Sequence, residues 1–428
     1  MSFLNTQPYK GTRDFFPEDK RLQNWMFEQV HQCLRLFGYQ EYDGPLLEPF
    51  EVYAAKTGEE IVNQQLYWMM DRGDRKMAIR PEMTPTLARM VAAKFQDLPK
   101  PIRWYSIPNL YRYEKPQKGR LREHWQLNVD ILGGEASLAD LEVIRLALDL
   151  FKYLKGERFF SIQINNRKLM DHFFIHGAKL AEAQISKASK AIDARAKISP
   201  EEFKAWLLKD GLNEIQVLEI DKFLNSTFEQ ILAHYPCEGA SELEKLFASL
   251  KPELKDGRVK FDPSIMRGFD YYTGTVFEGY DVSPENRRAL FGGGRYDNLV
   301  GMFGKNKLSG IGFGLGDVTL GDFLKTHELL PSFSHWVDVY VGVPSEGVLS
   351  MAQSVSSQLR VAGLSCIESL QFEGFGAQLK NASKLGSRFA VLLGEEELKS
   401  GEASIKDLKN GEQFRSKLSE IAAAIKNR

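Results

Sequence analysis

Residues 107–133 read IPNLYRYEKPQKGRLREHWQLNVDILG, and the alternation of their side chains predicts a hairpin of two strands joined by a loop. In the second strand the apolar side chains share one face and the other face is wholly polar. The polar face carries Arg122, His124, Gln126, Asn128 and Asp130. A strand of this kind typically covers a core with its apolar face and lines a wet cleft with its polar face. We therefore expect a ligand site in front of this hairpin.

The loop of the hairpin is cationic. It carries Lys115, Lys118 and Arg120 around a proline and a glycine. A flexible loop with these charges suits an anionic ligand such as a nucleotide. An ordinary amphipathic hairpin would show the same pattern, and the residues alone leave that alternative open.

The length of the chain predicts several domains. With 428 residues, it exceeds what one hydrophobic core usually fills, so two or three domains are expected. Hydrophobic residues make up 43% and charged residues 26% of the sequence, which is typical of a soluble globular protein rather than a disordered one. The net charge is -1, so any contact with nucleic acid would depend on local basic patches.

Cysteine usage and hydropathy indicate the compartment. Cys33, Cys237 and Cys366 lie far apart, which favours a reducing environment over a disulfide framework or a zinc site. The first twenty residues contain no apolar signal region, and no run of about 18 apolar residues follows. We expect a cytoplasmic protein with no membrane span and no structural metal.

Strand and helix patterns divide the chain into four parts. Strand patterns mark residues 1–166 and return in residues 256–328. The segment between them, residues 167–255, is helix-rich and charged and has the character of an inserted helical subdomain. From residue 331 to residue 428 strands and helices alternate, which predicts a separate small α/β unit.

Local signals predict where three helices of the first part begin or end. Gly38 is expected to end a long amphipathic helix that follows the N-terminal segment. Thr84 or Thr86 is expected to cap the next well-marked helix. Ser137, with Asp140 three residues later, is expected to cap the helix after the hairpin.

Two further stretches carry polar residues that suit a ligand site. In MRGFDYYTGTVFE, alternation places Arg267 and Tyr271 on one face. In FGGGRYDNL, three glycines permit close approach of a ligand to the backbone, and Arg295 follows them. Each stretch has a plainer explanation, namely a surface ion pair, a packed tyrosine pair or a glycine-rich turn. Their occurrence together with the hairpin favours a functional site.

Taken together, these segments resemble the histidyl-tRNA synthetase family over nearly the whole chain. KGTRDFFP with the following helix is similar to the dimer-forming first motif, and RPEMT to the amino-acid-binding segment. YRYEKPQKGRLREHWQ resembles motif 2 of class II synthetases in its histidine-specific form. RGFDYYTGTVFE and FGGGRYDNLVGMFG resemble the two signatures that separate this family from other class II enzymes. GEEEL and EASIKDLKNGEQ are similar to the family's anticodon-binding domain.

The resemblance implies an α+β fold. Its core would be the class II antiparallel sheet flanked by helices, formed by residues 1–166 and 256–328. Residues 167–255 would be a helical insertion, and residues 331–428 a C-terminal α/β anticodon-binding domain. The resemblance also implies a homodimer.

The implied activity is a two-step ligation. The carboxylate of L-histidine attacks the α-phosphorus of ATP, bound as its Mg²⁺ complex, to give histidyl-adenylate and pyrophosphate. A ribose hydroxyl at the 3′ end of the cognate tRNA then takes the histidyl group. Positioning and charge stabilisation drive such phosphoryl chemistry, and the resemblance implies no metal bound by the protein itself.

The resemblance assigns roles residue by residue. Arg112 and Arg267 would be catalytic and would hold the α-phosphate from opposite sides, with Arg267 taking a role that a metal fills in relatives. The positions that match histidine-binding residues are Glu82, Met83, Thr84, Gln126, Asp130, Tyr271 and Tyr272. The positions that match ATP-binding residues are Arg112, Glu114, Arg120 and Arg267. Gln117 and Lys118 would meet the acceptor end of the tRNA.

Motif 3 departs from the family pattern. Class II enzymes usually end this motif with an acidic residue and an arginine that binds the γ-phosphate. Here GIGFGLGDVTL has Gly316, Asp317 and Val318 where that pair is expected. Arg295 or Arg120 is a candidate to replace the missing arginine, and a different mode of binding the triphosphate is the remaining alternative.

The departure favours an alternative function. The alternative is a catalytically silent, histidine-binding regulatory paralogue of a histidine-biosynthetic phosphoribosyltransferase. Such subunits lack the anticodon domain and usually the Arg267 segment, and this chain has sequences similar to both. A synthetase for another amino acid is disfavoured by the RGFDYYTG segment.

Overall fold

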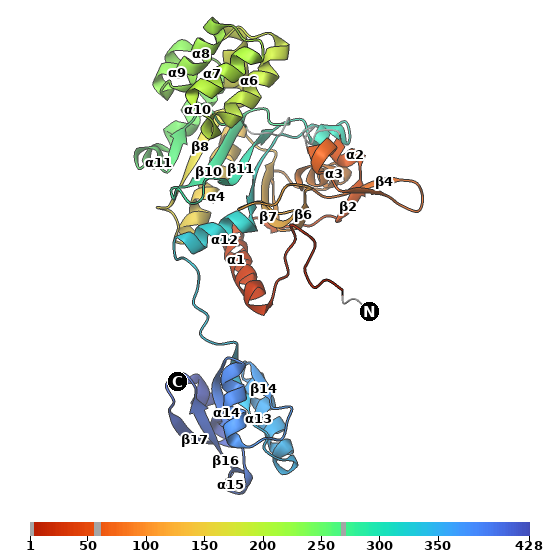
Figure 1. Cartoon of the computed structure of the whole chain (residues 1–428), viewed down its shortest axis with the longest axis vertical. Helices are drawn as coiled ribbons and strands as arrows, with labels where there is room; N and C mark the ends of the chain where they lie inside the picture. The colour runs from red at the N-terminus through yellow and green to blue at the C-terminus, as the bar shows by residue number, and fades with distance from the viewer. Residues whose placement is uncertain (1–3, 55–60, 267–270) are drawn as a thin grey trace. The chain divides into compact units, whose positions relative to one another are not determined.

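The computed structural model describes residues 4–54, 61–266 and 271–428 (Figure 1). The chain forms two compact units, Met1–Leu330 and Pro331–Arg428. Within the described residues, no helix is both long and apolar enough to cross a membrane.

A large mixed sheet organises the first unit. Among the described residues it has nine strands, and most neighbouring strands run antiparallel. In sheet order the strands are β1 (Gln40–Glu41), β5 (Ile102–Ser106), β7 (Glu123–Leu132), β12 (Gly310–Gly316), β11 (Ala289–Tyr296), β10 (Thr275–Asp281), β8 (Phe160–Asn166) and β9 (Val259–Phe261), with β6 (Asn109–Tyr111) paired to β7. The edge pairs β1–β5 and β8–β9 are parallel. With the helices that flank this sheet, the expected α+β class is confirmed.

Helices cover one face of this sheet. They are α1 (Pro17–Leu36), α4 (Ala136–Tyr153) and α12 (Asp317–Thr326). Their apolar side chains form one core with the sheet, in which the ring of Phe151 stacks on Phe160 and packs edge-on against Phe323. The opposite face of the central strands is therefore left for polar side chains.

The predicted hairpin is present as β6 and β7. The two strands pair antiparallel, and a single bridge between Gln117 and Arg120 closes the loop between them. On β7, the side chains of Leu127, Val129 and Ile131 enter the core behind the sheet. Gln126, Asn128 and Asp130 alternate with them and point to the other face, as the sequence pattern predicts.

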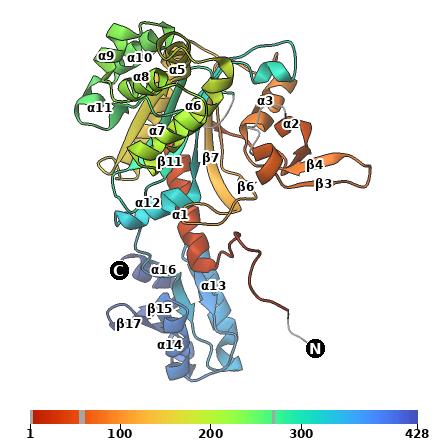
Figure 2. The same ribbon diagram turned by 45° about the horizontal axis from the view of Figure 1, so that its top comes forward.

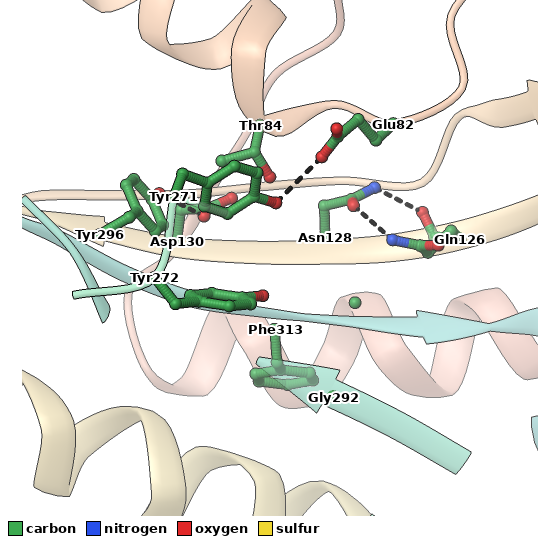
Figure 3. A pocket seen from close by; sticks show the side chains of 12 residues that line it. Glu82, Thr84, Gln126, Asn128, Asp130, Tyr271, Tyr272, Gly292, Tyr296 and Phe313 are labelled. Atoms are coloured by element: carbon green, nitrogen blue, oxygen red, sulfur yellow. Dashed lines mark hydrogen bonds between the residues drawn. The ribbon is translucent and has the colours of Figure 1, made fainter. Parts of the chain in front are cut away.

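A small sheet and several short helices lie next to the hairpin. The sheet consists of β2 (Leu47–Pro49), β4 (Lys76–Ile79) and β3 (Trp68–Met70), and it is accompanied by α2 (Glu51–Ala54), η1 (Ile61–Gln65), α3 (Thr84–Ala93) and η4 (Val300–Met302). Apolar side chains of α3, β5, β6 and η4 form a second core. The N-terminus of α3 is held beside the polar face of β7 (Figure 3).

Helix ends follow the sequence signals in one case and not in two. Gly38 follows α1 with φ +74°, the left-handed conformation expected of a glycine after a helix. Helix α3 begins at Thr84 and its N-cap is Met83, so neither predicted threonine caps it. Both threonines lie inside the first turn, where their backbones are already helical.

The predicted cap of α4 is also wrong. The helix begins at Ala136 with Glu135 as N-cap and no side-chain cap bond, so Ser137 lies within the helix. Asp140 makes no capping bond at this helix start. Its carboxylate is buried and pairs with Arg295 of β11. Asp140, which the local pattern assigned to the helix cap, is thus paired with Arg295, 155 positions away in the sequence.

Between β8 and β9 the chain forms a bundle of short helices (Figures 1 and 2). These are α5 (Arg167–His172), η2 (Phe173–Gly177), α6 (Glu182–Ala194), η3 (Arg195–Lys197), α7 (Pro200–Lys209), α8 (Glu214–Leu224), α9 (Phe228–His234), α10 (Glu238–Ser249) and α11 (Lys251–Lys255). Reciprocal cap bonds of Ser199 with Glu202 and of Asn213 with Gln216 set two of the helix starts. The apolar residues of the bundle continue the main core.

The second unit is an α/β unit with its own core. Its sheet has the order β14 (Cys366–Glu368), β13 (Val337–Val341), β15 (Ser387–Leu392), β16 (Glu402–Asp407) and β17 (Gln413–Lys417). Its helices are η5 (Glu346–Val348), α13 (Leu349–Val361), α14 (Phe375–Lys384), α15 (Glu395–Ser400), η6 (Leu418–Glu420) and α16 (Ile421–Lys426). The polar edge strand β17 precedes the last helix, α16.

Candidate active site

A cavity of about 70 Å³ opens on the polar face of β7 (Figure 3). Six of the seven residues predicted to bind the amino acid line it: Glu82, Thr84, Gln126, Asp130, Tyr271 and Tyr272. They come from three distant parts of the sequence, namely the start of α3, β7 and the segment before β10. The cavity also has lining residues outside the set predicted to bind the amino acid: Asn128, Gly292, Tyr296, Gly312, Phe313 and Gly314.

Two buried carboxylates lie in this cavity. Glu82 and Asp130 are each 3% exposed. The hydroxyl of Tyr271 donates to Oε2 of Glu82 at 3.0 Å, and the hydroxyl of Tyr296 donates to Oδ1 of Asp130 at 2.5 Å. Two carboxyl groups held in one enclosed space favour a cationic ligand such as an ammonium group.

Burial controls the charge of Asp130. It raises the pKa of the carboxyl to about 7, and the negative charge of Glu82 acts in the same direction, while the hydrogen bond from Tyr296 partly opposes both. Near neutral pH this carboxyl is therefore poised between its two forms, and an entering cation favours the ionised form.

Aromatic rings form one wall of the cavity. The ring of Tyr271 packs edge-on against Tyr272 at 5.0 Å and against Tyr296 at 5.9 Å between centroids. Burial raises the pKa of the Tyr271 hydroxyl well above its ordinary value, and the charge of Glu82 adds to this effect. The hydroxyl is thus a proton donor at any physiological pH. Such a wall suits a flat ligand ring that also has polar atoms.

Gln126 and Asn128 orient one another on the neighbouring part of β7. The Gln126 side-chain amide nitrogen donates to Oδ1 of Asn128 at 2.8 Å, and the Asn128 side-chain amide nitrogen donates to the Gln126 backbone carbonyl at 2.9 Å (Figure 3). The first of these bonds fixes the direction of the Gln126 side chain, and the second ties the Asn128 side chain to the backbone of β7.

Glycines of β12 provide the space in which these side chains lie. A Cβ atom at Gly312 would come within 2.3 Å of both the Asp130 carboxylate and the Val129 carbonyl. A Cβ atom at Gly314 would come within 2.2 Å of the Gln126 amide nitrogen. Any side chain at either position would displace the polar groups of β7, so both positions of β12 require glycine.

Met83, the seventh residue of the predicted set, does not line the cavity. It is fully buried in the core formed with Leu87 and Val91. Its position between Glu82 and Thr84 explains the arrangement, because anchoring this one side chain fixes the backbone of both neighbours.

The two predicted catalytic arginines differ in what can be described. Arg267 lies outside the described residues. The guanidinium of Arg112 donates through Nε to the Pro81 carbonyl at 2.9 Å, and its terminal nitrogens make no hydrogen bond within the described part of the chain. Arg112 is not among the cavity-lining residues. Burial, with the charge of Arg112, lowers the pKa of the neighbouring His124 to about 3, so this imidazole is neutral.

The predicted ATP-side residues of the loop form an ion pair. Nη1 of Arg120 lies 2.8 Å from Oε2 of Glu114. Lys118 donates to the Glu285 backbone carbonyl at 3.2 Å, which connects the loop to the segment before β11. Gln117 closes the loop through its backbone contacts with Arg120.

Arg295 is not available to replace the missing arginine of motif 3. It is 4% exposed, and its guanidinium binds Asp140, Ser309 and the Ala136 carbonyl. The prediction that it replaces that arginine is therefore wrong, because the buried Asp140 carboxylate holds it away from the cavity. Its structural role is to connect β11 to the start of α4.

Asp317, at the position where an acidic residue and arginine were expected, also has a structural role. Its carboxylate accepts from Arg13 at 2.8 Å, from the Trp125 backbone at 3.0 Å and from Gln23 at 3.4 Å. It therefore connects the N-terminal segment, β7 and the start of α12.

The lining residues outside the predicted binding set had recognisable signals in the sequence. Asn128 lies on the polar face of β7 between Gln126 and Asp130, so the alternation itself predicts its direction. Tyr296 directly follows Arg295 in the glycine-rich stretch, and the alternation of GIGFGLG places glycine at every second position opposite β7. What the sequence could not show is that these residues meet at one cavity.

Family models match nearly all of the chain. The model described as histidyl-tRNA synthetase matches residues 11–318, and the model described as anticodon binding domain matches residues 338–428. A histidine–tRNA ligase from Leptospira biflexa is 46% identical over 427 residues, which are 99% of this chain and 98% of that protein. A histidine–tRNA ligase from Pyrococcus horikoshii is 34% identical, covering 98% of each chain.

Solved structures with the same fold extend over the same length. The crystal structure of histidyl-tRNA synthetase from Nostoc sp. PCC 7120 aligns with a TM-score of 0.82 and 28% identity, covering 100% of both chains. A structure described as an ATP phosphoribosyltransferase regulatory subunit/histidyl-tRNA synthetase from Bacillus halodurans C aligns with a TM-score of 0.75 and 23% identity, covering 91% of this chain. The second likeness concerns the fold alone.

Proposed function

Because the chain belongs to the histidyl-tRNA synthetase family and is a histidine–tRNA ligase, we propose that the cavity in front of β7 is the site where it binds and activates histidine. The enzyme joins L-histidine to tRNA and uses ATP as the second substrate. The observation that carries the assignment of the site is the pair of buried carboxylates, Glu82 and Asp130, enclosed with a tyrosine wall.

In this proposal the amino acid is recognised at both ends. Glu82 and Asp130 bind the α-ammonium group, and Thr84 and Gln126 orient it. Tyr271 and Tyr272 surround the imidazole. The proposal is supported by the hydroxyl of Tyr271, which is already held by Glu82 at 3.0 Å, and by the mutual hydrogen bonds that fix Gln126. A site with positioned polar groups rejects analogues that lack the matching atoms.

Activation in this proposal depends on two guanidinium groups. Arg112 holds the α-phosphate and the histidine carboxylate, and Arg267 approaches the same phosphate from the other side. The tether of Arg112 to the Pro81 carbonyl supports this role, because it uses only Nε and leaves the terminal nitrogens for a bidentate contact. As the carboxylate oxygen of histidine bonds to the α-phosphorus, the bond to the β-phosphate oxygen breaks and pyrophosphate leaves with the electron pair.

The remaining assignments concern ATP, tRNA and the assembly. We assign Glu114 and Arg120 to the nucleotide, which enters as its Mg²⁺ complex, and Gln117 and Lys118 to the tRNA acceptor end. Residues 1–166 and 256–328 form the catalytic domain in this proposal, residues 167–255 its insertion and residues 331–428 the anticodon-binding domain. The working form is a cytoplasmic homodimer.

A regulatory paralogue is the second candidate function. The altered motif 3, with Asp317 engaged in structural contacts, is the observation that favours it. The anticodon-domain match over residues 338–428 opposes it, because a subunit that only binds histidine has no use for such a domain.

Histidine-dependent ATP–pyrophosphate exchange distinguishes the two functions. The purified protein with Mg²⁺, ATP and labelled pyrophosphate should form labelled ATP only when histidine is present, because exchange requires reversible adenylate formation. Direct titration with histidine serves as the control for a folded site. A protein that binds histidine but shows no exchange would be the regulatory paralogue and not the ligase.

Replacing Arg267 by alanine tests the proposed chemical role of this residue. The variant should bind histidine with nearly unchanged affinity. It should form adenylate at least about a hundredfold more slowly, because it has lost the guanidinium that stabilises the negative charge of the transition state. Single-turnover formation of adenylate measures the chemical step directly. Adenylate formation at the wild-type rate would exclude this role for Arg267.

A further inference from the structure

A second cavity, of about 160 Å³, lies between the loop after β6 and the start of α12. Cationic side chains enter it from two sides: Lys118 from the loop, and Arg287 and Arg288 from the segment before β11. Gly119 and Thr319 complete the lining side by side, because a Cβ atom at Gly119 would lie 3.7 Å from Cγ2 of Thr319. The proposed function assigns no residue of the segment before β11, and it uses Lys118 only toward the tRNA.

The side chain of Arg288 is positioned but not neutralised. It packs against the loop so closely that a Cβ atom at Gly119 would lie 3.0 Å from its Cδ. Within the described residues its guanidinium makes no hydrogen bond and no ion pair. Burial lowers the pKa of Arg288, and the charge of Arg120 lowers it further. Both features indicate a cation held in place without an anion of its own.

Two carboxylates, Glu285 and Asp322, also line the cavity, but they do not take this charge. Neither forms an ion pair with Arg288 among the described residues. Glu114, whose charge partly offsets the effect on Arg288, already pairs with Arg120 at 2.8 Å. The guanidinium groups of Arg120 and Arg288 therefore have only the Glu114 carboxylate between them, so one positive charge is left for an anionic ligand to neutralise.

The second cavity is built on the same strands as the first. On β11, Leu290 lines the second cavity and Gly292 lines the first, and residues two apart on a strand are separated by roughly 7 Å. β12 and the helix that continues it contribute Gly314 to the first cavity and Thr319 to the second. A ligand centred on the first cavity can therefore extend an anionic tail toward Arg288.

The position of the second cavity corresponds to the missing part of motif 3. In class II synthetases the arginine that is absent here follows the glycine-rich strand, where α12 begins in this chain. Thr319 lies in the first turn of α12 and has no charge to offer. Arg295 is held by Asp140 and is excluded. Arg288 brings a guanidinium to this place from the adjoining strand.

We propose that Arg288, together with Lys118, binds the γ-phosphate of ATP and the departing pyrophosphate in place of the missing motif 3 arginine. This inference rests on the proposed histidine-activating site. Arg288 takes part in no bond exchange. It holds the phosphates while the α–β phosphoanhydride bond breaks, and the pyrophosphate carries away the electron pair of that bond. It is thus a binding residue for the triphosphate tail and has no role toward histidine.

The test compares ATP with AMP, which lacks the two outer phosphates. In Arg288→Ala, the dissociation constant of ATP and the KM values of ATP and pyrophosphate in the exchange assay should rise roughly ten- to a hundredfold, as expected for lost hydrogen bonds to charged groups. The dissociation constants of AMP and histidine should change less than about twofold. Arg145→Ala is the matched control, because Arg145 is an exposed arginine of α4 whose guanidinium hydrogen-bonds only the Ser249 carbonyl among the described residues.

Rescue separates a phosphate contact from a structural role. Arg288→Lys keeps the positive charge but loses the planar guanidinium that can bind a phosphate through two N–H groups. Its ATP affinity should therefore lie between those of the wild type and Arg288→Ala. Equal losses of ATP, AMP and histidine affinity would mean that Arg288 only supports the fold. Unchanged ATP and pyrophosphate constants in Arg288→Ala would overturn the inference while leaving the ligase function intact. Absence of exchange in the wild type would instead contradict the proposed function.

Discussion

Replacing Tyr296 by phenylalanine removes a single oxygen from the candidate site and keeps the ring. That oxygen donates to Asp130 at 2.5 Å and is the contact that holds the pKa of this buried carboxyl down to about 7. A hydrogen bond to a charged group contributes about 1.5–3 kcal/mol, and 1.36 kcal/mol corresponds to about one pKa unit. In Tyr296→Phe the pKa of Asp130 should therefore rise by roughly one to two units.

The shift should change the pH dependence of histidine binding. If the α-ammonium group requires an ionised Asp130, affinity is full above the pKa of Asp130 and falls as the pH drops below it. At pH 7 about half of the wild-type carboxyls are ionised, against a few per cent in the variant, so the variant should bind histidine roughly tenfold more weakly. Near pH 9 the wild-type carboxyl is fully ionised and at least about half of the variant carboxyls are ionised, so the difference should shrink to about twofold or less.

Calorimetric titration with histidine from about pH 6 to pH 9 measures this effect. The imidazole and ammonium groups of free histidine also titrate, but they cancel in the ratio of the two proteins at each pH. Asp130→Asn is the control, because it removes the titrating group and should bind weakly at every pH. A ratio that does not change with pH would refute the link between Tyr296, Asp130 and the ammonium group.

Two other substitutions test the surroundings of the site. Gly314→Ala should raise the KM for histidine roughly tenfold with little change in thermal stability, because the new Cβ would lie 2.2 Å from the Gln126 amide nitrogen and displace it. Gly316→Ala is the control: its new Cβ would have its nearest contact with Thr319 at 3.5 Å, so the exchange kinetics should not change. Arg295→Met should lower the free energy of unfolding in urea by about 3–5 kcal/mol, because it leaves the Asp140 carboxylate buried without its partner. The double variant Arg295→Met with Asp140→Leu should recover much of that loss, and a double variant as unstable as the single one would contradict this account.

The sequence predicted those parts of the site that depend on local pattern. The alternation along β7 gave the directions of Gln126 and Asp130 correctly, because a strand has only two faces and one of them is fixed by the core. The resemblance supplied Glu82, Tyr271 and Tyr272, which lie far from β7 in sequence and which no local pattern could bring to it.

What the sequence failed to predict depends on distant partners. Arg295 follows three glycines and looks like a ligand-binding residue, but Asp140 removes it from the site. Ser137 looks like a helix cap, yet the helix begins one residue earlier. The mostly polar side chains of β17 show no apolar alternation, which an edge strand does not need, so the local pattern does not predict a strand there. In each case a contact far along the chain outweighs the local preference.

The glycines of β12 that face β7 restrict which substitutions the protein can accept. Every single-base change of a glycine codon that alters the residue adds at least a Cβ atom, and at Gly312 even that atom would lie 2.3 Å from a backbone carbonyl. There is no smaller residue to substitute and no neighbouring side chain that can be trimmed to make room. Inherited variation should therefore be nearly absent at this position, although it lies in a strand with no catalytic side chain of its own.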